Sequence, residues 1–337
     1  MHGTGNHPGA RADQYPPVVV RLPGRAQASD AHQLLIEPNA PFALELTAWG
    51  LRRRPQNAVD RWDASTYQRV VPIDGGPVAL SVAQKDAFDR PRLSVLLTGR
   101  PIDQRAEVLA RGALDRLLGL NVDLSGFAAM AEPDPLLGPL ARRMRGRKPP
   151  RFPTVFEALV NGVACQQLSL AVGIHLLNRL TAAHGRPAAQ DPAGPRAFPG
   201  PDQLAGIQPE HLRRHGFSLT KARTIVDTAR AIVTGDLDLE ALEQLDDPAA
   251  IARLTRLRGI GRWTPEYVLL RGLGRLQIFP GDDVGAHNKL RRFFDIDTPL
   301  DYDSVKRLVA RWQPYAGMVY FHLLLGSLSE TGLVSVE

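Results

Sequence analysis

The spacing of apolar residues changes once along this chain, near residue 122, and this change restricts the fold more than any other feature. Before it, short runs alternate apolar and polar residues between Gly- and Pro-rich breaks, a pattern typical of antiparallel strands. These runs cover residues 42–49, 67–73, 77–84 and 92–99. A stretch with helical spacing follows at 102–120. The first third of the chain therefore predicts a small antiparallel sheet covered by at least one helix.

After residue 122 the strand patterns almost disappear, and many short stretches with helical spacing follow without a fixed repeat period. This favours an irregular helical part over a solenoid of repeats. We predict an α+β fold that is mainly helical. Its segments are a disordered tail at 1–32, an α/β domain at 33–132, helical domains at 133–328 and a C-terminal tail at 329–337.

Composition and charge narrow the class of protein. The single cysteine, Cys165, excludes a disulfide within the chain and any all-cysteine zinc or iron–sulfur site built from this chain alone. No stretch approaches the roughly 20 apolar residues that span a bilayer, and the N-terminus lacks the apolar run of a secretory signal. We expect a cytoplasmic protein without a membrane partner. The excess of 41 Lys and Arg over 35 Asp and Glu permits a polyanionic partner but does not demonstrate one.

The sequence LRGIGRW, at residues 257–263, lies between two stretches with helical spacing. Glycines on both sides of Ile260 allow positive φ and keep side chains away from an approaching ligand. The helix that follows begins with N–H groups that lack a partner inside the helix, and these can hold a phosphate. Positive charge surrounds the turn, from Arg253, Arg256, Arg258 and Arg262. Taken alone, the motif is also compatible with a glycine that merely ends one helix before the next begins.

This turn and a second motif, IFPGDDVGAHNKL at 278–290, resemble the helix-hairpin-helix (HhH-GPD) superfamily of DNA glycosylases. Within that superfamily the resemblance is nearest to the bacterial DNA-3-methyladenine glycosylase II (AlkA) branch. Further matching segments at 148–170, 216–225 and 311–323 occur in the expected order. The resemblance implies a helical helix-hairpin-helix core preceded by an α/β domain.

The resemblance also implies an enzyme that cleaves the bond between a damaged base and deoxyribose once the nucleotide has flipped out of the duplex. Positive charge develops on the sugar during this cleavage, and a nearby carboxylate stabilises it. The resemblance places that carboxylate at Asp283, the second residue of the pair Asp282 and Asp283. An Asp just before a helix is also a typical N-cap, and the two roles can coexist.

Aromatic residues are expected to line the pocket for the flipped base. Trp263 and Tyr267 are four residues apart and therefore share one face of a helix. Electron-rich rings stack well on a cationic alkylated base. The alternative is that both rings belong to the core. Trp312, Tyr315 and Tyr320 are weaker candidates for the same pocket.

Hydrolysis without strand cleavage is expected. In relatives that cut the strand, a lysine stands two residues after the second glycine of the hairpin and forms a Schiff base. Trp263 occupies that position here, between Arg262 and Thr264. The resemblance therefore implies a monofunctional hydrolase that leaves an abasic site.

The resemblance assigns contacts to DNA as well. The hairpin residues expected to hold the strand are Gly259, Ile260, Gly261 and Arg262. Gln167, in the sequence CQQLS, is expected to fill the gap that the flipped base leaves. The backbone carbonyls of Leu257, Gly259 and Ile260 are expected to bind a monovalent cation, and no organic cofactor is expected.

Three features leave alternatives open. Ser218 and Lys221 either contact phosphate or belong to the start of a helix. The basic run at 142–151 is either a solvated linker or a DNA contact. His322 is expected to be a packed helix residue rather than a catalyst.

We therefore expect a monomeric base-excision glycosylase for alkylated purines such as 3-methyladenine. Its partner would be double-stranded DNA with damaged bases, in the cytoplasm at the nucleoid. One alternative is a glycosylase for other damaged or mismatched bases. Another is a non-catalytic module that uses the hairpin only to grip DNA, and such a module needs neither the carboxylate nor an aromatic pocket.

Overall fold

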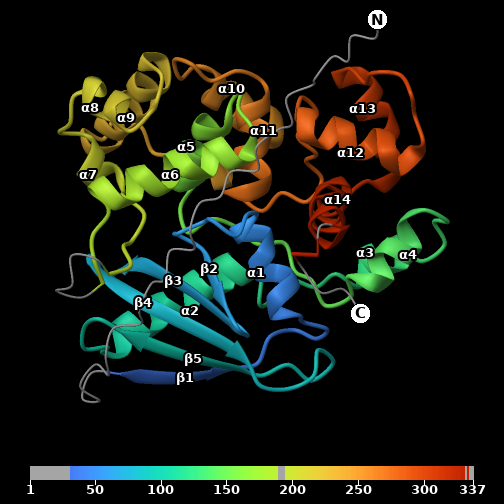
Figure 1. Ribbon diagram of the computed structural model, residues 1–337, viewed down its shortest axis with the longest axis horizontal. Helices are drawn as coiled ribbons and strands as arrows, with labels where there is room; N and C mark the ends of the chain where they lie inside the picture. Colours follow the sequence, from blue (N-terminus) through green and yellow to red (C-terminus); the bar gives the residue numbers. More distant parts are fainter. Residues whose placement is uncertain (1–30, 189–193, 331, 334–337) are drawn as a thin grey trace, which may run out of the picture.

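The computed structural model describes residues 31–188, 194–330 and 332–333. An antiparallel sheet in the order β1-β5-β4-β3-β2 forms one end of the molecule (Figure 1). Its strands are β1 (His32–Ile36), β2 (Arg61–Asp63), β3 (Thr66–Ile73), β4 (Gly76–Gln84) and β5 (Leu93–Thr98). The prediction of strands at 67–73, 77–84 and 92–99 is confirmed, whereas β1 and β2 were not predicted.

The strand predicted at residues 42–49 is wrong, because this segment lies in helix α1 (Leu44–Arg52). Seven of its nine residues are buried, since the helix packs against the sheet, against α2 and against the C-terminal helix. A helix buried on nearly all sides carries no polar stripe, so its sequence resembles a buried strand. The helix ends at Arg53, which adopts a left-handed conformation with φ 57° and is itself buried.

Helix α2 (Gln104–Leu118) confirms the helix predicted at 102–120. Asp103 caps its start by accepting a hydrogen bond from the Ala106 N–H at 2.7 Å. Val108 is 64% exposed and Leu109 is 41% exposed, so these two apolar residues do not belong to the buried face of the helix. The buried residues of α2 are Ala106, Ala110, Leu114, Leu117 and Leu118.

Beyond α2, the described part of the chain is mainly helical, as predicted, and most of these helices lie on one side of the sheet (Figure 1). The helices are α3 (Ser125–Ala131), α4 (Leu137–Arg143), α5 (Val155–Cys165), α6 (Leu170–His184), α7 (Pro201–Leu204), α8 (Pro209–Arg214), α9 (Leu219–Val233), α10 (Asp247–Thr255), α11 (Trp263–Arg271), α12 (Val284–Phe294), α13 (Tyr302–Val309) and α14 (Ala316–Glu330), with 3-10 turns at Glu240–Gln244 and Ala310–Trp312. None of the helices among the described residues is long and apolar enough to cross a membrane.

The buried apolar side chains of the sheet part and of the helical part form one contiguous cluster. The boundary predicted between residues 132 and 133 stays a prediction. Most of the predicted N-terminal tail lies outside the described residues, although β1 begins at His32. Helix α14 continues to Glu330, past residue 329 where the predicted C-terminal tail begins, and residues 334–337 lie outside the described residues.

Part of the basic run at 142–151 is neither solvated nor exposed to DNA. Arg147 and Lys148 are both 2% exposed. The Arg147 guanidinium lies 4.9 Å from the centre of the Phe321 ring, and Lys148 Nζ donates to the Val122 carbonyl at 2.6 Å. Both alternatives considered for this run are therefore wrong at these two residues, because the chain crosses here between the sheet part and the helical part.

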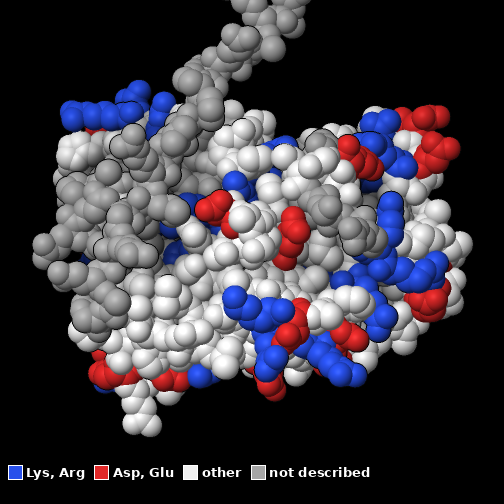
Figure 2. Space-filling view, turned by 60° about the horizontal axis from the view of Figure 1, so that its bottom comes forward, with Lys and Arg blue, Asp and Glu red and all other residues white. Residues whose placement is uncertain are grey.

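Surface charge is mixed on the face that Figure 2 shows. Lys and Arg side chains lie beside Asp and Glu there, and wide areas carry neither charge. The net charge of +6 therefore does not gather into a continuous basic patch on this face.

Candidate active site

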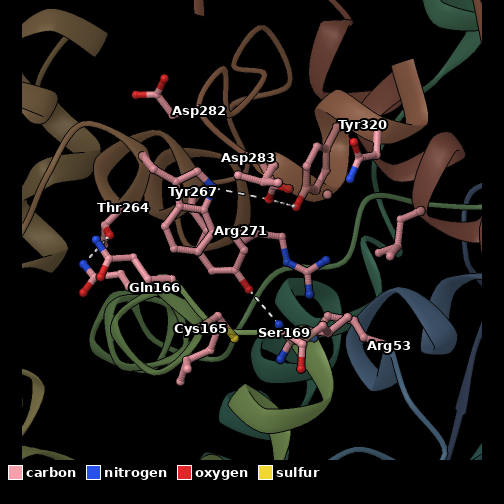
Figure 3. A pocket seen from close by; sticks show the side chains of 18 of the residues that line it. Arg53, Cys165, Gln166, Ser169, Thr264, Tyr267, Arg271, Asp282, Asp283 and Tyr320 are labelled. Carbon is pink, nitrogen blue, oxygen red and sulfur yellow. Dashed lines mark hydrogen bonds between the residues drawn. The ribbon is translucent and has the colours of Figure 1, made fainter. Parts of the chain in front are cut away.

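A cavity of about 920 Å³ opens between the hairpin and the C-terminal helices. Segments that are distant in the sequence line it: the end of α1, the loop between α5 and α6, the α10–α11 hairpin, the start of α12 and helix α14. Asp283, Tyr267 and Tyr320 point toward one another within it (Figure 3), and Trp263 lines it as well. The structure thus brings the predicted catalytic carboxylate and both predicted pocket aromatics into one cavity.

Asp283 uses its two carboxylate oxygens differently. Oδ1 accepts a hydrogen bond from the Ala286 N–H at 2.8 Å and so caps helix α12. Oδ2 accepts from Trp263 Nε1 at 3.2 Å and from the Tyr320 hydroxyl at 3.0 Å (Figure 3). These three donors fix the orientation of the carboxylate at the cavity wall.

The two aromatic residues on α11 have different environments. Trp263 is half-buried and Tyr267 is 4% exposed, with ring centres 5.1 Å apart. The Tyr267 hydroxyl accepts a hydrogen bond from Arg53 Nη1 at 2.9 Å, while Arg53 Nη2 donates to Asn161 Oδ1 at 2.6 Å. Both rings line the cavity, and Tyr267 packs into the core as well.

The three weaker aromatic candidates lie in different parts of the structure, and Tyr320 is the one that lines the cavity among the described residues. Tyr320 belongs to the site through its bond to Asp283. Trp312 is buried elsewhere and donates from Nε1 to Asp134 Oδ2 at 3.0 Å. Tyr315 packs against Phe127 at a ring-centre distance of 6.0 Å, and neither Trp312 nor Tyr315 lines the cavity.

Burial sets the protonation of the phenols and the thiol in the cavity. It raises the pKa of Tyr267, and it raises the pKa of Tyr320 well above the ordinary value with a further contribution from the Asp283 charge. Both phenols therefore stay protonated at neutral pH, which lets Tyr320 donate to Asp283. Burial also raises the pKa of the Cys165 thiol, so this side chain is a poor nucleophile.

The hairpin connects α10 to α11 through residues 256–262. Gly259 has φ +79°, and a Cβ atom there would lie 2.4 Å from Thr224 Oγ1. Ile260 is 6% exposed and anchors the turn in the core, whereas Gly261 has open space around it. Among the described residues no side chain caps the start of α11 at Arg262, so the N–H groups of Trp263 and Thr264 stay available to a ligand. All four arginines predicted around the turn are exposed: Arg253, Arg256, Arg258 and Arg262.

Two neighbouring elements hold the hairpin in place. Gln166 Nε2, at the end of α5, donates to the Gly259 carbonyl at 3.1 Å and to Thr264 Oγ1 at 2.9 Å. Thr224 Oγ1, on α9, donates to the Arg258 carbonyl at 2.8 Å. Lys221 Nζ donates to the Gln166 carbonyl at 2.7 Å, which ties α9 to the same loop. The sequence pattern did not single out Gln166.

Gln167 lies next to Gln166 in the loop between α5 and α6. It is exposed, it lines the rim of the cavity, and its φ of +53° is in the left-handed region. Ser218 is the N-cap of α9 and accepts from the Lys221 N–H at 3.3 Å. The Lys221 amine is engaged with backbone carbonyls rather than directed freely at solvent.

His322 is a packed residue, as expected, and does not line the cavity. It is 2% exposed, and its Nδ1 lies 2.7 Å from the Met318 carbonyl, which requires Nδ1 to be the donor. Burial, with the nearby Arg147 charge, lowers the pKa of His322 to about 3.

Four basic residues of the cavity, Arg53, Arg54, Arg271 and Lys289, were missed. Arg53 comes from the N-terminal part, Arg271 ends the helix that Trp263 begins, and Lys289 lies on α12. Burial lowers the pKa of Lys289. Two of them had a sequence signal: Arg271 continues the four-residue spacing of Trp263 and Tyr267, and Lys289 lies within the motif at 278–290.

Comparison with known proteins gives the family. The HhH-GPD superfamily of base excision DNA repair proteins matches residues 160–314. A DNA-3-methyladenine glycosylase of Bacillus subtilis is 30% identical over 247 residues, which cover 72% of this chain and 81% of that protein. The chain belongs to the HhH-GPD superfamily. The match of the family begins within α5 and contains the hairpin and Asp283.

Other relatives extend the comparison to the sheet part. A probable bifunctional transcriptional activator/DNA repair enzyme AlkA of Mycobacterium tuberculosis is 29% identical over 90% of this chain, which spans 59% of that protein. The putative DNA-3-methyladenine glycosylase YfjP of Bacillus subtilis is 32% identical over 50% of this chain, and the match spans 58% of its length. The solved 3-methyladenine DNA glycosylase of Archaeoglobus fulgidus shares the fold with a TM-score of 0.78, over 89% of this chain and 100% of that chain, at 24% identity. The predicted HhH-GPD fold with an N-terminal sheet is confirmed.

Proposed function

We propose that this protein is a DNA glycosylase of base excision repair that hydrolyses the N-glycosidic bond of alkylated purines of the 3-methyladenine type, flipped out of duplex DNA. The observation that carries the proposal is the Asp283 carboxylate, held by Trp263 and Tyr320 at the wall of a cavity beside the hairpin. The names of relatives such as the Bacillus subtilis DNA-3-methyladenine glycosylase support the substrate class.

Asp283 is the catalytic residue of the proposed reaction. Its Oδ2 faces the cavity, where it stabilises the positive charge that develops on the deoxyribose and orients the attacking water. The neutral Tyr320 phenol and the Trp263 indole hold the carboxylate without adding charge. Trp263 and Tyr267 supply ring faces on which the flipped base stacks.

The hairpin is the proposed DNA clamp. Gly259, Ile260, Gly261 and Arg262 bring backbone N–H groups and the open start of α11 to the strand. The exposed arginines around the turn attract phosphates without reading sequence. Gln167, at the exposed tip of the neighbouring loop, is the proposed wedge into the duplex gap.

The hairpin carbonyls also fit the monovalent cation that the family resemblance implies. The carbonyls of Leu257 and Gly259 each accept one hydrogen bond, from the Ile260 N–H and from Gln166 Nε2. Because a carbonyl oxygen has two lone pairs, each keeps one for a cation, together with the carbonyl of Ile260. Such an ion would neutralise phosphate charge at the turn. No organic cofactor is proposed.

The protein is proposed to act as a monomer on damaged double-stranded DNA in the cytoplasm, at the nucleoid. Solved relatives in complex with DNA support this kind of partner, including the Schizosaccharomyces pombe 3-methyladenine DNA glycosylase.

Release of free base from duplexes that carry single alkylated, deaminated or oxidised bases tests the proposal. Free 3-methyladenine is the expected product, and strand breaks are expected only after alkali treatment. The Lys289 amine lines the cavity, so a Lys289→Met variant should be assayed in parallel. Breaks without alkali would contradict hydrolysis, and their loss in Lys289→Met would assign them to that amine. No base release from any duplex would contradict the glycosylase itself.

A further inference from the structure

Two basic residues at the wall of the cavity have no role in the proposed reaction. Arg54 follows α1 and so comes from the sheet part of the molecule. Lys289 lies on α12, the helix that Asp283 caps. The fold therefore brings two positive charges from distant parts of the sequence to the same cavity, beside the proposed catalytic carboxylate.

The Arg54 guanidinium has no acceptor within the described part of the chain. Its Nε is buried and forms no hydrogen bond. The terminal nitrogens Nη1 and Nη2 are not buried in this way, and neither bonds to a described residue. The side chain as a whole is partly buried. A guanidinium that has lost part of its hydration without gaining an acceptor is stabilised by a ligand that supplies one, most of all by an anion.

Lys289 is held only weakly. Its Nζ donates to the Gly285 carbonyl at 3.3 Å, which is longer than the usual range of about 2.7–3.2 Å. Burial lowers the pKa of Lys289, the Asp283 charge opposes this shift, and the Arg54 charge adds to it. The two cations are therefore close enough to repel each other. Such a pair in a partly dehydrated site is stabilised by an anion that contacts both.

The carboxylates around this pair already have other partners. Those that line the cavity are Asp282 and Asp283, and Asp282 pairs with Arg262 at 2.7 Å. Asp283 accepts from neutral donors and faces the proposed reaction. Further along α12, Glu330 pairs with Arg292 at 3.0 Å. An anion for Arg54 and Lys289 must therefore come from a ligand, and a DNA strand at the cavity carries one on every phosphate.

We propose that Arg54 and Lys289 together bind a phosphate of the damaged strand next to the flipped nucleotide, so that the sheet part holds the DNA in addition to the hairpin. A phosphodiester has two unesterified oxygens that share one negative charge, and these suit a forked guanidinium beside an amine. This inference rests on the proposed binding of damaged duplex, and it assigns a DNA contact to the N-terminal part of the chain.

The first test measures binding without base release. The duplex carries a tetrahydrofuran residue, an abasic analogue from which no base can be released. Arg54→Met is expected to bind it about tenfold more weakly at low salt, the effect of hydrogen bonds to a charged group. The slope of log affinity against log salt should become shallower by about one, because one phosphate contact is lost. Unchanged affinity and slope would overturn the inference.

Arg61→Met is the matched control. Arg61 lies on β2 in the same part of the molecule, and its Nε is also buried without a partner among the described residues. It does not line the cavity. This variant should keep the affinity and the salt dependence of the unchanged protein. Equal losses in the two variants would attribute the effect to net charge or to the sheet part as a whole, and would overturn the role of Arg54.

The second test locates the phosphate. A methylphosphonate linkage, in which a methyl group replaces the charged oxygen, is placed in turn at each linkage beside the analogue. At one linkage it should weaken binding of the unchanged protein about tenfold, but weaken Arg54→Met much less, because the partner of that charge is already gone. Additive losses at every linkage would overturn the inference. Lys289→Met should repeat the pattern at the same linkage, and it decides the inference if Arg54→Met does not fold.

The two proposals fail in different ways. If the protein binds the duplexes as expected but releases no base from any damaged duplex, the glycosylase proposal fails and the phosphate site remains. If it releases bases while Arg54 shows no coupling to any phosphate, only the phosphate site fails.

Discussion

Asp283 caps α12 and is also the proposed catalytic carboxylate. Its sequence context alone does not decide between these two roles. Oδ1 caps α12 and Oδ2 faces the cavity with two side-chain donors, so the cap orients the oxygen that would act on the sugar. A carboxylate held in this way needs little reorganisation when positive charge develops beside it. The structural role of Asp283 therefore supports its proposed catalytic role.

His322 gives a prediction about pH and stability at the scale of one residue. Its pKa is about 3 in the folded protein, below the ordinary value of 6.5. Between these values the unfolded chain binds a proton that the folded protein does not, so stability falls as pH falls from about 6.5. This residue contributes up to about 1.4 kcal/mol of unfolding free energy per pH unit.

The measurement is denaturant unfolding of the protein and of a His322→Gln variant between about pH 5 and 6.5, the range in which an unfolded histidine gains its proton. The variant should lose less stability on acidification than the unchanged protein, because Gln does not titrate. Parallel curves would contradict the low pKa of His322.

At the scale of elements, the hairpin depends on the backbone of Gly259. Ala at this position must adopt φ +79° and places Cβ 2.4 Å from Thr224 Oγ1, which itself bonds the Arg258 carbonyl. We predict that Gly259→Ala lowers the free energy of unfolding by at least about 1–2 kcal/mol, the cost of the left-handed conformation alone.

Gly261→Ala is the matched control, because a Cβ atom on this glycine would meet no atom of the described residues within 4 Å and its φ is not positive. Its free energy of unfolding should change by less than about 0.5 kcal/mol. Equal loss of stability in both variants would show that the hairpin does not require the conformation of Gly259.

The parts of the site that sequence could predict are those with local patterns. The hairpin, Asp283, Trp263 and Tyr267 all lie between residues 257 and 283, so motif and helical spacing placed them together. Arg53 could not be found in this way. It reaches Tyr267 across 214 residues of sequence, from a helix whose buried surroundings made it resemble a strand.

Gln166 shows a second limit of sequence reasoning. Its side chain bridges the end of α5 to the hairpin, 93 residues away at Gly259, and no local pattern distinguishes this glutamine from Gln167. The two glutamines differ in the structure. Gln167 has a left-handed backbone and an exposed side chain, whereas the side chain of Gln166 is directed to the hairpin.

At the scale of the whole molecule, the sheet part and the helical part share one apolar core. Arg53, which follows α1 in the sheet part, also donates a hydrogen bond to the Tyr267 hydroxyl on α11. We predict that the two parts unfold together, so far-UV circular dichroism and tryptophan fluorescence should give coincident thermal transitions. Two separated transitions would contradict a shared core.

The central claim is that Asp283 acts as a charged carboxylate on the flipped nucleotide. Asn at this position can still cap α12 and fill the same volume, but carries no charge. Single-turnover release of 3-methyladenine by Asp283→Asn, with duplex affinity measured on the same preparation, is the most direct test. We predict that release falls by at least about a hundredfold while duplex affinity is retained. Release at the unchanged rate would contradict the claim. The claim would also fail if the variant lost duplex affinity to an extent that explains the lost release.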